Sequence, residues 1–290
     1  MQDDQSSRSA RVLACVDQSH YADTVGDYAA WAACRLAAPL EFLHVIDREP
    51  EIASSHDHSG AIGIDAREDL LGALSSEDEA RTRAARERGR KFLERLRQRA
   101  SAAGCPSVDV RQRHGSLDET LVEQEPDVQL FVLGRRGASA EITQRDLGRN
   151  LERMLRALQR PILTVTDVWR EPRRVLIALD GRRTSRKAVE FVARSALFDG
   201  VSVQVFAAGA VEGNRQLDAA VQLLQEAGRS PTVLPAVGDV ERGVATALRD
   251  TESDLLVMGA YAHSWLRSLF VGSRTNGLLR ASSVPTLMVR

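Results

Sequence analysis

The sequence predicts two α/β domains in tandem, each built around a parallel β-sheet. The chain has 290 residues, which corresponds to two domains at about 150 residues each. An apolar run ending on Asp occurs twice, as RVLACVD at 11–17 and RVLIALD at 174–180. An apolar run ending on Gly follows in each half, as DVQLFVLG at 127–134 and DLLVMG at 254–259. Short apolar runs that alternate with helical patterns are typical of βα units in a parallel sheet.

The first half alternates predicted strands with predicted helices. Val25, Tyr28, Ala32 and Leu36 recur at the i, i+3/i+4 spacing of a buried helix face. A later helix is predicted to begin at the S-x-x-E capping box of Ser116–Glu119. The predicted strands are 11–17, 41–46, 108–114, 128–134 and 162–166, and the predicted helices are 23–37, 79–103, 116–125 and 147–159.

The second half repeats this scheme, with predicted strands at 174–180, 202–208, 232–237, 255–259 and 285–289. The first half is longer than the second between its second and fourth strands. The additional residues, about 48–85, are expected to form a surface insertion or lid. The predicted organisation is a flexible N-terminal tail at 1–10, a first domain at 11–168, a linker at 169–173 and a second domain at 174–290.

The charge balance and the apolar pattern exclude several classes of protein. The chain carries 39 Lys+Arg against 40 Asp+Glu, so it lacks the basic footprint of a general nucleic-acid-binding protein. No apolar run approaches the roughly 18 residues of a membrane span, so we expect no membrane insertion. The polar, acidic N-terminus does not resemble a signal peptide.

The cysteine spacing favours a reduced, cytoplasmic protein. Cys15, Cys34 and Cys105 form no CxxC pair, so neither a disulfide framework nor a zinc site is expected. Cys15 lies inside a predicted strand and is expected to be a buried core thiol. Cys105 precedes Pro106 and is expected to be exposed.

The carboxyl ends of the predicted strands form the candidate binding edge, because open parallel sheets bind ligands there, where the strand order reverses. Four residues lie at such ends: Asp17, Gly134, Asp180 and Gly259. After Gly259, the spacing to Ala262 and then to Gly272-Ser273 fits a phosphate-binding loop. Small residues let backbone amides approach a phosphate, and a hydroxyl group adds one hydrogen bond.

The glycine spacing and the repeated strand pattern resemble the universal stress protein family. That family has the nucleotide motif G-x2-G-x9-G-[ST] and a first strand that ends on Asp. The resemblance runs through both halves, in RVLIALDGRRTS, VLGRRG, LGRNLERMLRALQRPILTV and the segments VMGAYAHS, GSRT and VPTLMVR. It implies two doubly wound α/β domains, each a five-stranded parallel sheet of order 3-2-1-4-5 flanked by helices. Their last strands, Ile162–Thr166 and Thr286–Val289, would pair antiparallel to form a pseudo-dimer.

The resemblance also implies adenine nucleotide binding, with ATP as the ligand, with or without Mg²⁺. In members that bind ATP, the Asp and a residue near the end of the second strand contact adenosine, while the glycines and a hydroxyl residue hold the phosphates. In the second half these positions are Asp180, Ala207, Gly259, Ala262, Gly272, Ser273 and Arg274. In the first half they are Asp17, Val45, Gly134, Gly137, Gly148 and Arg149.

Both candidate sites depart from the family motif. Ala262 replaces the second glycine, and its methyl group either crowds the phosphate or strains the loop. In the first half ten residues precede Gly148, and Arg149 replaces the hydroxyl residue. The Arg149 guanidinium either binds phosphate or serves as an internal counter-ion for Asp17. We therefore expect the second half to bind nucleotide more readily than the first.

The expected function is that of a stress-response regulator or sensor that binds ATP or a related adenine nucleotide and acts through a protein partner. Homodimerisation is compatible with this role. Two alternatives stay open: a nucleotide-free protein-interaction module with degenerate clefts, and a slow ATPase. No catalytic constellation is evident, because the G-x-S-x-G and HExxH patterns are absent.

Histidines and a basic segment offer weaker candidates for a site. His56-Asp57-His58 is expected to be a solvated loop, because successive residues seldom converge on one metal ion. His44 and His114 are expected to be hydrogen-bonded structural residues. The basic segment Arg81–Arg99 is expected to be a solvated helix face, because an apolar stripe runs through it and acidic residues precede it.

Overall fold

The computed structural model describes residues 10–46, 64–135, 153, 154, 157–180, 183–207, 213–235, 240–259, 282 and 284–290, with the side chains of 64–82 and 241 left out. The first half comprises β1 (Arg11–Cys15), α1 (Ala22–Arg35), β2 (Leu40–Ile46), α2 (Ile64–Ala102), β3 (Val108–His114), α3 (Leu117–Gln124), the 3₁₀ turn η1 (Glu125–Asp127), β4 (Val128–Gly134) and β5 (Ile162–Val165). The second half comprises β6 (Arg174–Leu179), α6 (Arg183–Arg194), the 3₁₀ turn η2 (Ala196–Phe198), β7 (Ser202–Ala207), α7 (Arg215–Glu226), β8 (Thr232–Pro235), α8 (Val240–Asp250), β9 (Leu255–Gly259) and β10 (Thr286–Val289).

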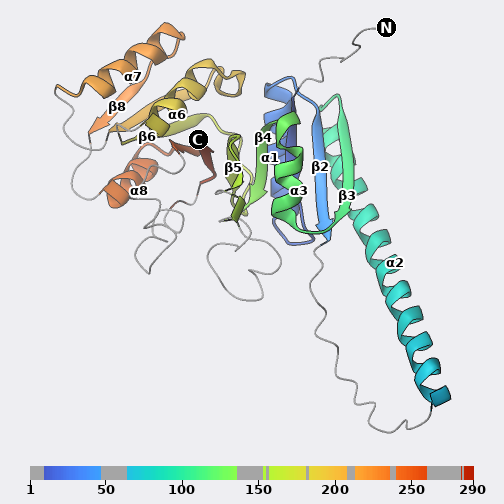
Figure 1. Cartoon of the computed structure of the whole chain (residues 1–290). Coiled ribbons are helices and arrows are strands. Elements are labelled where there is room, and N and C mark those ends of the chain that lie inside the picture. The colour runs from blue at the N-terminus through green and yellow to red at the C-terminus, as the bar shows by residue number, and fades with distance from the viewer. Residues whose placement is uncertain are drawn as a thin grey trace, which may run out of the picture.

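The strands that the structure describes form one continuous sheet in the order β3-β2-β1-β4-β5-β10-β9-β6-β7-β8 (Figure 1). Within each half, neighbouring strands are parallel, and the order is the one that the family resemblance implies. The two halves meet where β5 and β10 pair antiparallel, with Leu163 opposite Leu287. The tandem α/β fold and the pairing of the last strands are therefore confirmed.

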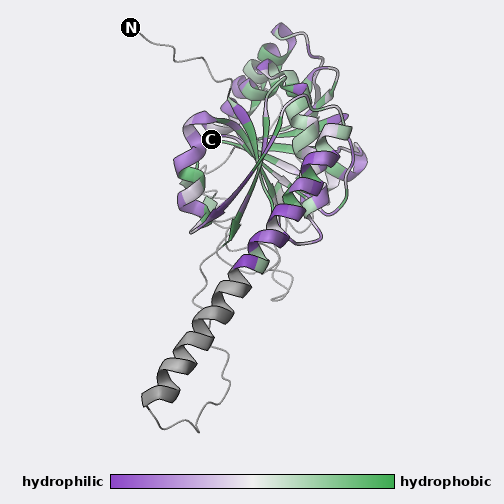
Figure 2. Ribbon diagram, turned by 90° about the vertical axis from the view of Figure 1, so that its right-hand side faces the viewer, coloured by the Kyte–Doolittle hydropathy of each residue, from purple (hydrophilic) through white to green (hydrophobic). Residues whose placement is uncertain are grey.

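The inner strands of the sheet are buried on both faces, as in other parallel sheets, whereas the outer strands β3 and β8 are partly exposed. Successive side chains of a strand point to opposite faces. On β1, Val12 and Ala14 join the apolar cluster beneath α1, α2, α6 and α7, whereas Leu13 joins the cluster beneath α3 and α8. Each cluster includes residues of both halves, so the core is continuous across the β5–β10 seam. Figure 2 shows the apolar strands enclosed by helices on both sides of the sheet.

Helix α2 begins earlier than the sequence predicted. It starts at Ile64 rather than near residue 79, and its N-terminal part extends well beyond the sheet (Figure 1). The predicted insertion at 48–85 is therefore helical from residue 64. The Ser, Asp, Gly and His residues of this stretch had indicated a surface insertion. The surrounding Ala, Leu, Glu and Arg residues are strong helix formers, and their propensity prevails over that of these residues.

Of two other local predictions, the structure contradicts one and describes only part of the other. Ser116 is the N-cap residue of α3, but its side chain makes no hydrogen bond to the helix amides and instead donates to the carboxylate of Asp118. The predicted capping box is therefore wrong. Of the predicted helix at 147–159, only residues 153, 154 and 157–159 are described, and 153, 154 and 157 are helical.

The segment that joins the two halves lies along α1. The hydroxyl of Thr24 donates to the carbonyl of Asp167 at 3.1 Å. The phenol of Tyr28 donates to the carbonyl of Val168 and accepts from the amide of Arg170 at 3.3 Å. The ring of Trp169 packs edge-on against that of Tyr28, with a centroid distance of 4.5 Å. These contacts attach the connection between β5 and β6 to the first half.

Candidate functional site

The second half brings three of its predicted residues to one edge of the sheet. In the strand order β7-β6-β9, Leu179 of β6 pairs with Ala207, and Ala178 pairs with Met258. Asp180 follows Leu179 directly, and Gly259 follows Met258. Asp180, Ala207 and Gly259 therefore occupy adjacent positions at the carboxyl ends of three neighbouring strands, where α/β sheets bind ligands.

Gly259 is required by the close approach of helix α6. A Cβ atom at residue 259 would lie 2.5 Å from the carbonyl carbon of Thr184 and 2.6 Å from the amide nitrogen of Ser185. These are backbone atoms, so they cannot move aside as the tip of a side chain can. Glycine at the end of β9 therefore allows the first turn of α6 to lie directly against the strand end.

The first turn of α6 adds an anion-binding feature to this edge. Helix α6 spans Arg183–Arg194, and the amides of a helix's first turn have no partner within the helix. These amides and the helix dipole favour a negatively charged group at this end. The hydroxyl oxygen of Thr184 is buried and has no hydrogen-bond partner among the residues that the structure describes.

The first half has an equivalent edge, at which the strand-end Asp makes a different set of contacts. Asp17 follows β1, which lies between β2, carrying Val45, and β4, ending at Gly134. The carboxylate of Asp17 accepts a hydrogen bond from the amide of Ser19 at 3.2 Å, which fixes the turn after β1. The hydroxyl of Ser19 is buried and without a hydrogen-bond partner among the described residues.

Arg135 distinguishes the first-half edge from the second. It follows Gly134 directly and is 7% exposed. Its guanidinium group donates to the carbonyl of Ser282 at 2.6 Å and to that of Val284 at 2.8 Å, both in the second half. Arg290 makes the reverse connection, donating to the carbonyl of Leu158 at 2.8 Å. The residue after Gly134 therefore joins the two halves, whereas the corresponding residue after Gly259 is Ala260.

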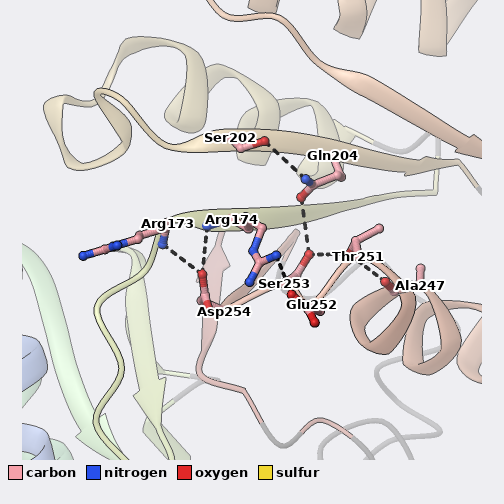
Figure 3. Close-up of polar contacts among 9 residues, drawn as sticks. All are labelled: Arg173, Arg174, Ser202, Gln204, Ala247, Thr251, Glu252, Ser253 and Asp254. Atoms are coloured by element: carbon pink, nitrogen blue, oxygen red, sulfur yellow. Dashed lines mark hydrogen bonds and ion pairs between the residues drawn. The ribbon is translucent and has the colours of Figure 1, made fainter.

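The amino ends of the second-half strands are fixed by a network at the opposite edge of the sheet (Figure 3). The carboxylate of Asp254 accepts from the backbone amides of Arg173 and Arg174, each at 3.0 Å. The amide of Asp254 donates in turn to the carbonyl of Arg174 at 2.8 Å. Buried Ser253 donates to Gln204 of β7 at 3.3 Å. Because these contacts set the register of β6, β7 and β9, they also align Asp180, Ala207 and Gly259.

The first half uses a buried ion pair at the same place. Glu41, at the start of β2, is 4% exposed. One of its carboxylate oxygens lies 2.9 Å from Nε of Arg11 and the other 2.7 Å from Nε of Arg111. Gln124 of α3 accepts hydrogen bonds from both arginines. This cluster joins β1, β2, β3 and α3 away from the candidate site.

Seven of the predicted site residues lie outside the described residues, so the structure does not place them. They are Gly137, Gly148 and Arg149 of the first half and Ala262, Gly272, Ser273 and Arg274 of the second half. His56-Asp57-His58 also lies outside the described residues. The residues that the structure does place are the Asp and strand-end positions of both edges.

The histidines that the structure describes at these strand ends have defined partners. Nδ1 of buried His44 lies 2.9 Å from the carbonyl oxygen of Val16, and its ring packs edge-on against Phe92. His114 is exposed and its Nε2 accepts from Arg86 of α2 at 3.3 Å. Both contacts agree with the predicted structural role.

Several basic residues of α2 are paired with carboxylates. Arg90 and Arg97 pair with Glu87 and Glu94 on the same helix. Arg95 and Arg99 pair with Asp23 and Asp27 on α1, at 2.7 Å in each case. The described part of the basic segment is thus an exposed helix face whose positive charge meets acidic partners.

The prediction for Cys105 is wrong. Its side chain is buried, with 6% of the residue exposed, because the turn before β3 packs against α1. Cys34, near the end of α1, is exposed, and its sulfur lies 3.0 Å from that of Cys105. Burial raises the pKa of the Cys15 thiol far above its ordinary value, in agreement with an inert core thiol.

Sequence reasoning missed the hydroxyl groups at the two edges. Thr184 follows Asp180 by four positions, and Ser19 follows Asp17 by two. A third hydroxyl, that of Thr166 directly after β5, is also buried and without a hydrogen-bond partner among the described residues. The signal that could have found the first two is a Ser or Thr between the strand-end Asp and the following helix.

The described part of the chain lacks two other features. None of its helices is both long and apolar enough to cross a membrane. The same residues contain no cluster of three or more His, Cys, Asp or Glu side chains arranged to hold a metal ion.

Comparisons with known proteins agree with the two-domain arrangement. The sequence model of the universal stress protein family matches residues 9–166 and again residues 171–290. Universal stress protein Slr1230 of Synechocystis sp. is 31% identical over 284 residues, which cover 96% of this chain and 99% of that protein.

Two solved structures are similar in fold over almost the whole chain. A universal stress protein from Archaeoglobus fulgidus DSM 4304 has a TM-score of 0.69 at 18% identity, covering 98% of this chain and 99% of that chain. A functionally unknown protein from Pseudomonas aeruginosa PAO1 has a TM-score of 0.59 at 16% identity, covering 97% of this chain and 93% of that chain. The chain belongs to the universal stress protein family and contains one family domain in each half.

Proposed function

We propose that this stress protein binds ATP or a related adenine nucleotide at the carboxyl edge of its second half, and that it regulates a protein partner in the cytoplasm. The observation that carries the proposal is the alignment of Asp180 and Gly259 beside the first turn of α6. This arrangement places an acidic group suited to ribose hydroxyls next to a helix N-terminus suited to phosphate.

The described residues fit a nucleotide in two respects. The unpartnered hydroxyl of Thr184 supplies a hydrogen-bond donor at the helix N-terminus. Gly259 keeps the backbone at the strand end free of a side chain, so that the first turn of α6 stays close to the edge. Asp180 would accept hydrogen bonds from the sugar, and the amides of α6 would help to hold the phosphates.

The first-half edge is proposed as the weaker site. There, Arg135 points toward the second half and donates to two of its carbonyl groups. Its charge therefore contributes to the connection between the halves rather than to a phosphate. Asp17 and the hydroxyl of Ser19 nevertheless correspond to Asp180 and the hydroxyl of Thr184 in the second half.

A homodimer of this chain would have to use a surface other than its last strands. Strands β5 and β10 already pair with each other inside the chain. The strands at the two ends of the described sheet are β3 and β8. We therefore propose that any self-association involves these outer strands or the helices.

The proposal is tested by measuring ATP affinity by calorimetry in a matched set of variants. Asp180→Asn should weaken binding more than Asp17→Asn, because the second half is the stronger site. Ala262→Gly should tighten binding and Gly272→Ala should weaken it, because these changes respectively restore and disturb the glycine spacing. Unchanged affinity across the four variants would contradict the proposal and favour a nucleotide-free interaction module.

A further inference from the structure

Two cysteines that are far apart in the sequence lie side by side in the first half. Cys34 is at the end of α1, and Cys105 is in the turn between α2 and β3. Their sulfur atoms are 3.0 Å apart, although 71 positions separate them in the chain. Cys34 is exposed to solvent, whereas Cys105 is buried. The pair therefore combines an accessible thiol with a protected one.

Hydrogen bonds to the backbone hold Cys105 in position against α1. The amide of Cys105 donates to the carbonyl of Ala100 at 3.2 Å, which fixes the turn after α2. The thiol of Cys105 donates to the carbonyl of Ala30 at 3.3 Å, which joins that turn to α1. Because a disulfide bond is about 2.0 Å long, the two sulfur atoms need to approach by only about 1 Å to form one.

We propose that Cys34 and Cys105 are a peroxide-sensitive pair that closes to an intramolecular disulfide. In the first step the Cys34 sulfur attacks a peroxide oxygen, so that the O–O bond breaks, a sulfenic acid forms and water leaves when the peroxide is hydrogen peroxide. In the second step the Cys105 sulfur attacks the Cys34 sulfur, so that the S–O bond breaks, the S–S bond forms and a second water leaves. Two thiols are oxidised, one peroxide is reduced, and both thiol hydrogens end in water.

The environment of each thiol assigns the order of these steps. Peroxide reaches an exposed thiol first, so Cys34 is the residue attacked. Burial, together with the neighbouring Cys34, raises the pKa of Cys105 to about 12, so Cys105 stays a thiol while peroxide oxidises the exposed Cys34. When the Cys105 sulfur attacks, its proton passes to the hydroxide that leaves the Cys34 sulfur as water. Cys105 then acts as the resolving thiol because it is already in contact with the oxidised sulfur.

The disulfide would stabilise the part of the molecule that joins the two halves. It would close a loop that contains β2 and α2 and would attach α1 to the start of β3. Helix α1 also carries Thr24 and Tyr28, which hold the connection between β5 and β6. Cross-linking two distant positions restricts the unfolded chain and so raises the stability of the folded one.

The test is a peroxide titration of the full-length, fully reduced protein. After treatment, free thiols are alkylated under denaturing conditions, the chain is digested without reduction and the peptides are identified by mass spectrometry. We expect a peptide pair linked through Cys34 and Cys105, an intact chain lighter by two hydrogen atoms, and an alkylated Cys15. The melting temperature of the oxidised protein should be higher than that of the reduced protein.

Three variants make the result specific. Cys15→Ser is the matched control and should leave the cross-link and the rise in melting temperature unchanged. In Cys34→Ser, Cys105 should stay alkylatable after peroxide treatment, because it is buried. In Cys105→Ser or Cys105→Ala, Cys34 should accumulate as a sulfenic acid that dimedone traps.

Other products would overturn the proposal. They are conversion of Cys34 to sulfinic or sulfonic acid without a cross-link, a disulfide between two chains, or two thiols that remain fully alkylatable. Each would show that contact between the sulfur atoms does not lead to an intramolecular bond. The melting temperature of each reduced variant confirms that it folds before its chemistry is interpreted.

Discussion

Gly259 and Thr184 are in direct backbone contact at the carboxyl edge of the second half. A Cβ atom at residue 259 would lie 2.5 Å from the carbonyl carbon of Thr184 and 2.8 Å from its Cβ atom. The glycine that begins the nucleotide motif therefore has a packing role of its own. The same contact places the first turn of α6 at the proposed phosphate position, so that one residue would serve both the packing and the proposed binding.

Gly259→Ala should both destabilise the protein and weaken nucleotide binding. The added methyl group must displace the first turn of α6, which we expect to cost about 1–3 kcal/mol, as in other overpacked positions. Urea unfolding and ATP titration measure the two effects. Gly26→Ala is the matched control. Gly26 lies in α1, and a Cβ atom there would meet its nearest neighbour, Leu96, at an ordinary distance of 3.5 Å. Equal stability of the two variants would contradict the claim that the contact with α6 leaves no room for a side chain at residue 259.

Loss of the Glu41 charge should be costly because that charge is buried between two arginines. Glu41→Gln removes the nearer carboxylate partner of Arg11, which is also largely buried, and leaves it with the more distant and exposed Asp127 at 3.6 Å. We expect a loss of about 2–3 kcal/mol in the free energy of unfolding. Glu252→Gln is the control, because the Glu252–Arg174 pair is exposed in the second half and should be worth less than about 1 kcal/mol. Similar losses in both variants would argue against the role of burial.

Replacement of Arg135 should loosen the seam between the two halves. Arg135→Met leaves the carbonyl groups of Ser282 and Val284 without their charged donor, which should cost about 2–4 kcal/mol. Arg88→Met is the control, because Arg88 is exposed on α2. Hydrogen exchange should report faster opening of the amides of β5 and β10 in Arg135→Met alone. Unchanged exchange in these strands would refute the assigned role.

The stability of the protein should fall in alkaline solution through Tyr28. Burial raises the pKa of Tyr28 to about 12, against an ordinary value near 10. Between these values the unfolded chain loses the phenol proton while the folded chain retains it. The contribution is thus fully present below about pH 10 and is lost as the pH rises toward 12, at a cost of at most about 3 kcal/mol.

Tyr28→Phe isolates this effect from other groups that titrate in the same range. The variant should be less stable than the unchanged protein near pH 8, because it lacks the hydrogen bonds to Val168 and Arg170. The difference between the two proteins in urea unfolding should shrink by about pH 11. A difference that is constant with pH would contradict the raised pKa.

The strand ends were predictable from the sequence because their signal is local. Asp17, Asp180, Gly134 and Gly259 each terminate an apolar run, and parallel strands bring such ends to one edge. The hydrogen bond from Arg135 to the carbonyl of Ser282 was not predictable from the sequence. The two residues meet only because β5 pairs with β10, and no short-range pattern predicts that strand pairing.

Two further predictions were wrong because a local signal was outweighed, in one case by packing and in the other by helix propensity. Cys105 follows Gly104 and precedes Pro106, which locally indicates an exposed turn, but packing of that turn against Ala30 buries its thiol. Helix α2 contains residues that indicate a loop, and their effect is outweighed by the propensity of the residues around them. Tertiary contact and summed propensity thus decided the elements that local signals misjudged.

Native mass spectrometry of the freshly purified protein is the most direct test of nucleotide binding. Any bound small molecule is released with acid and identified. We predict an adenine nucleotide at about one per chain, held by the second half, and its loss in Asp180→Asn but not in Asp17→Asn. A chain that carries no nucleotide and gains none from millimolar ATP with magnesium would contradict the claim.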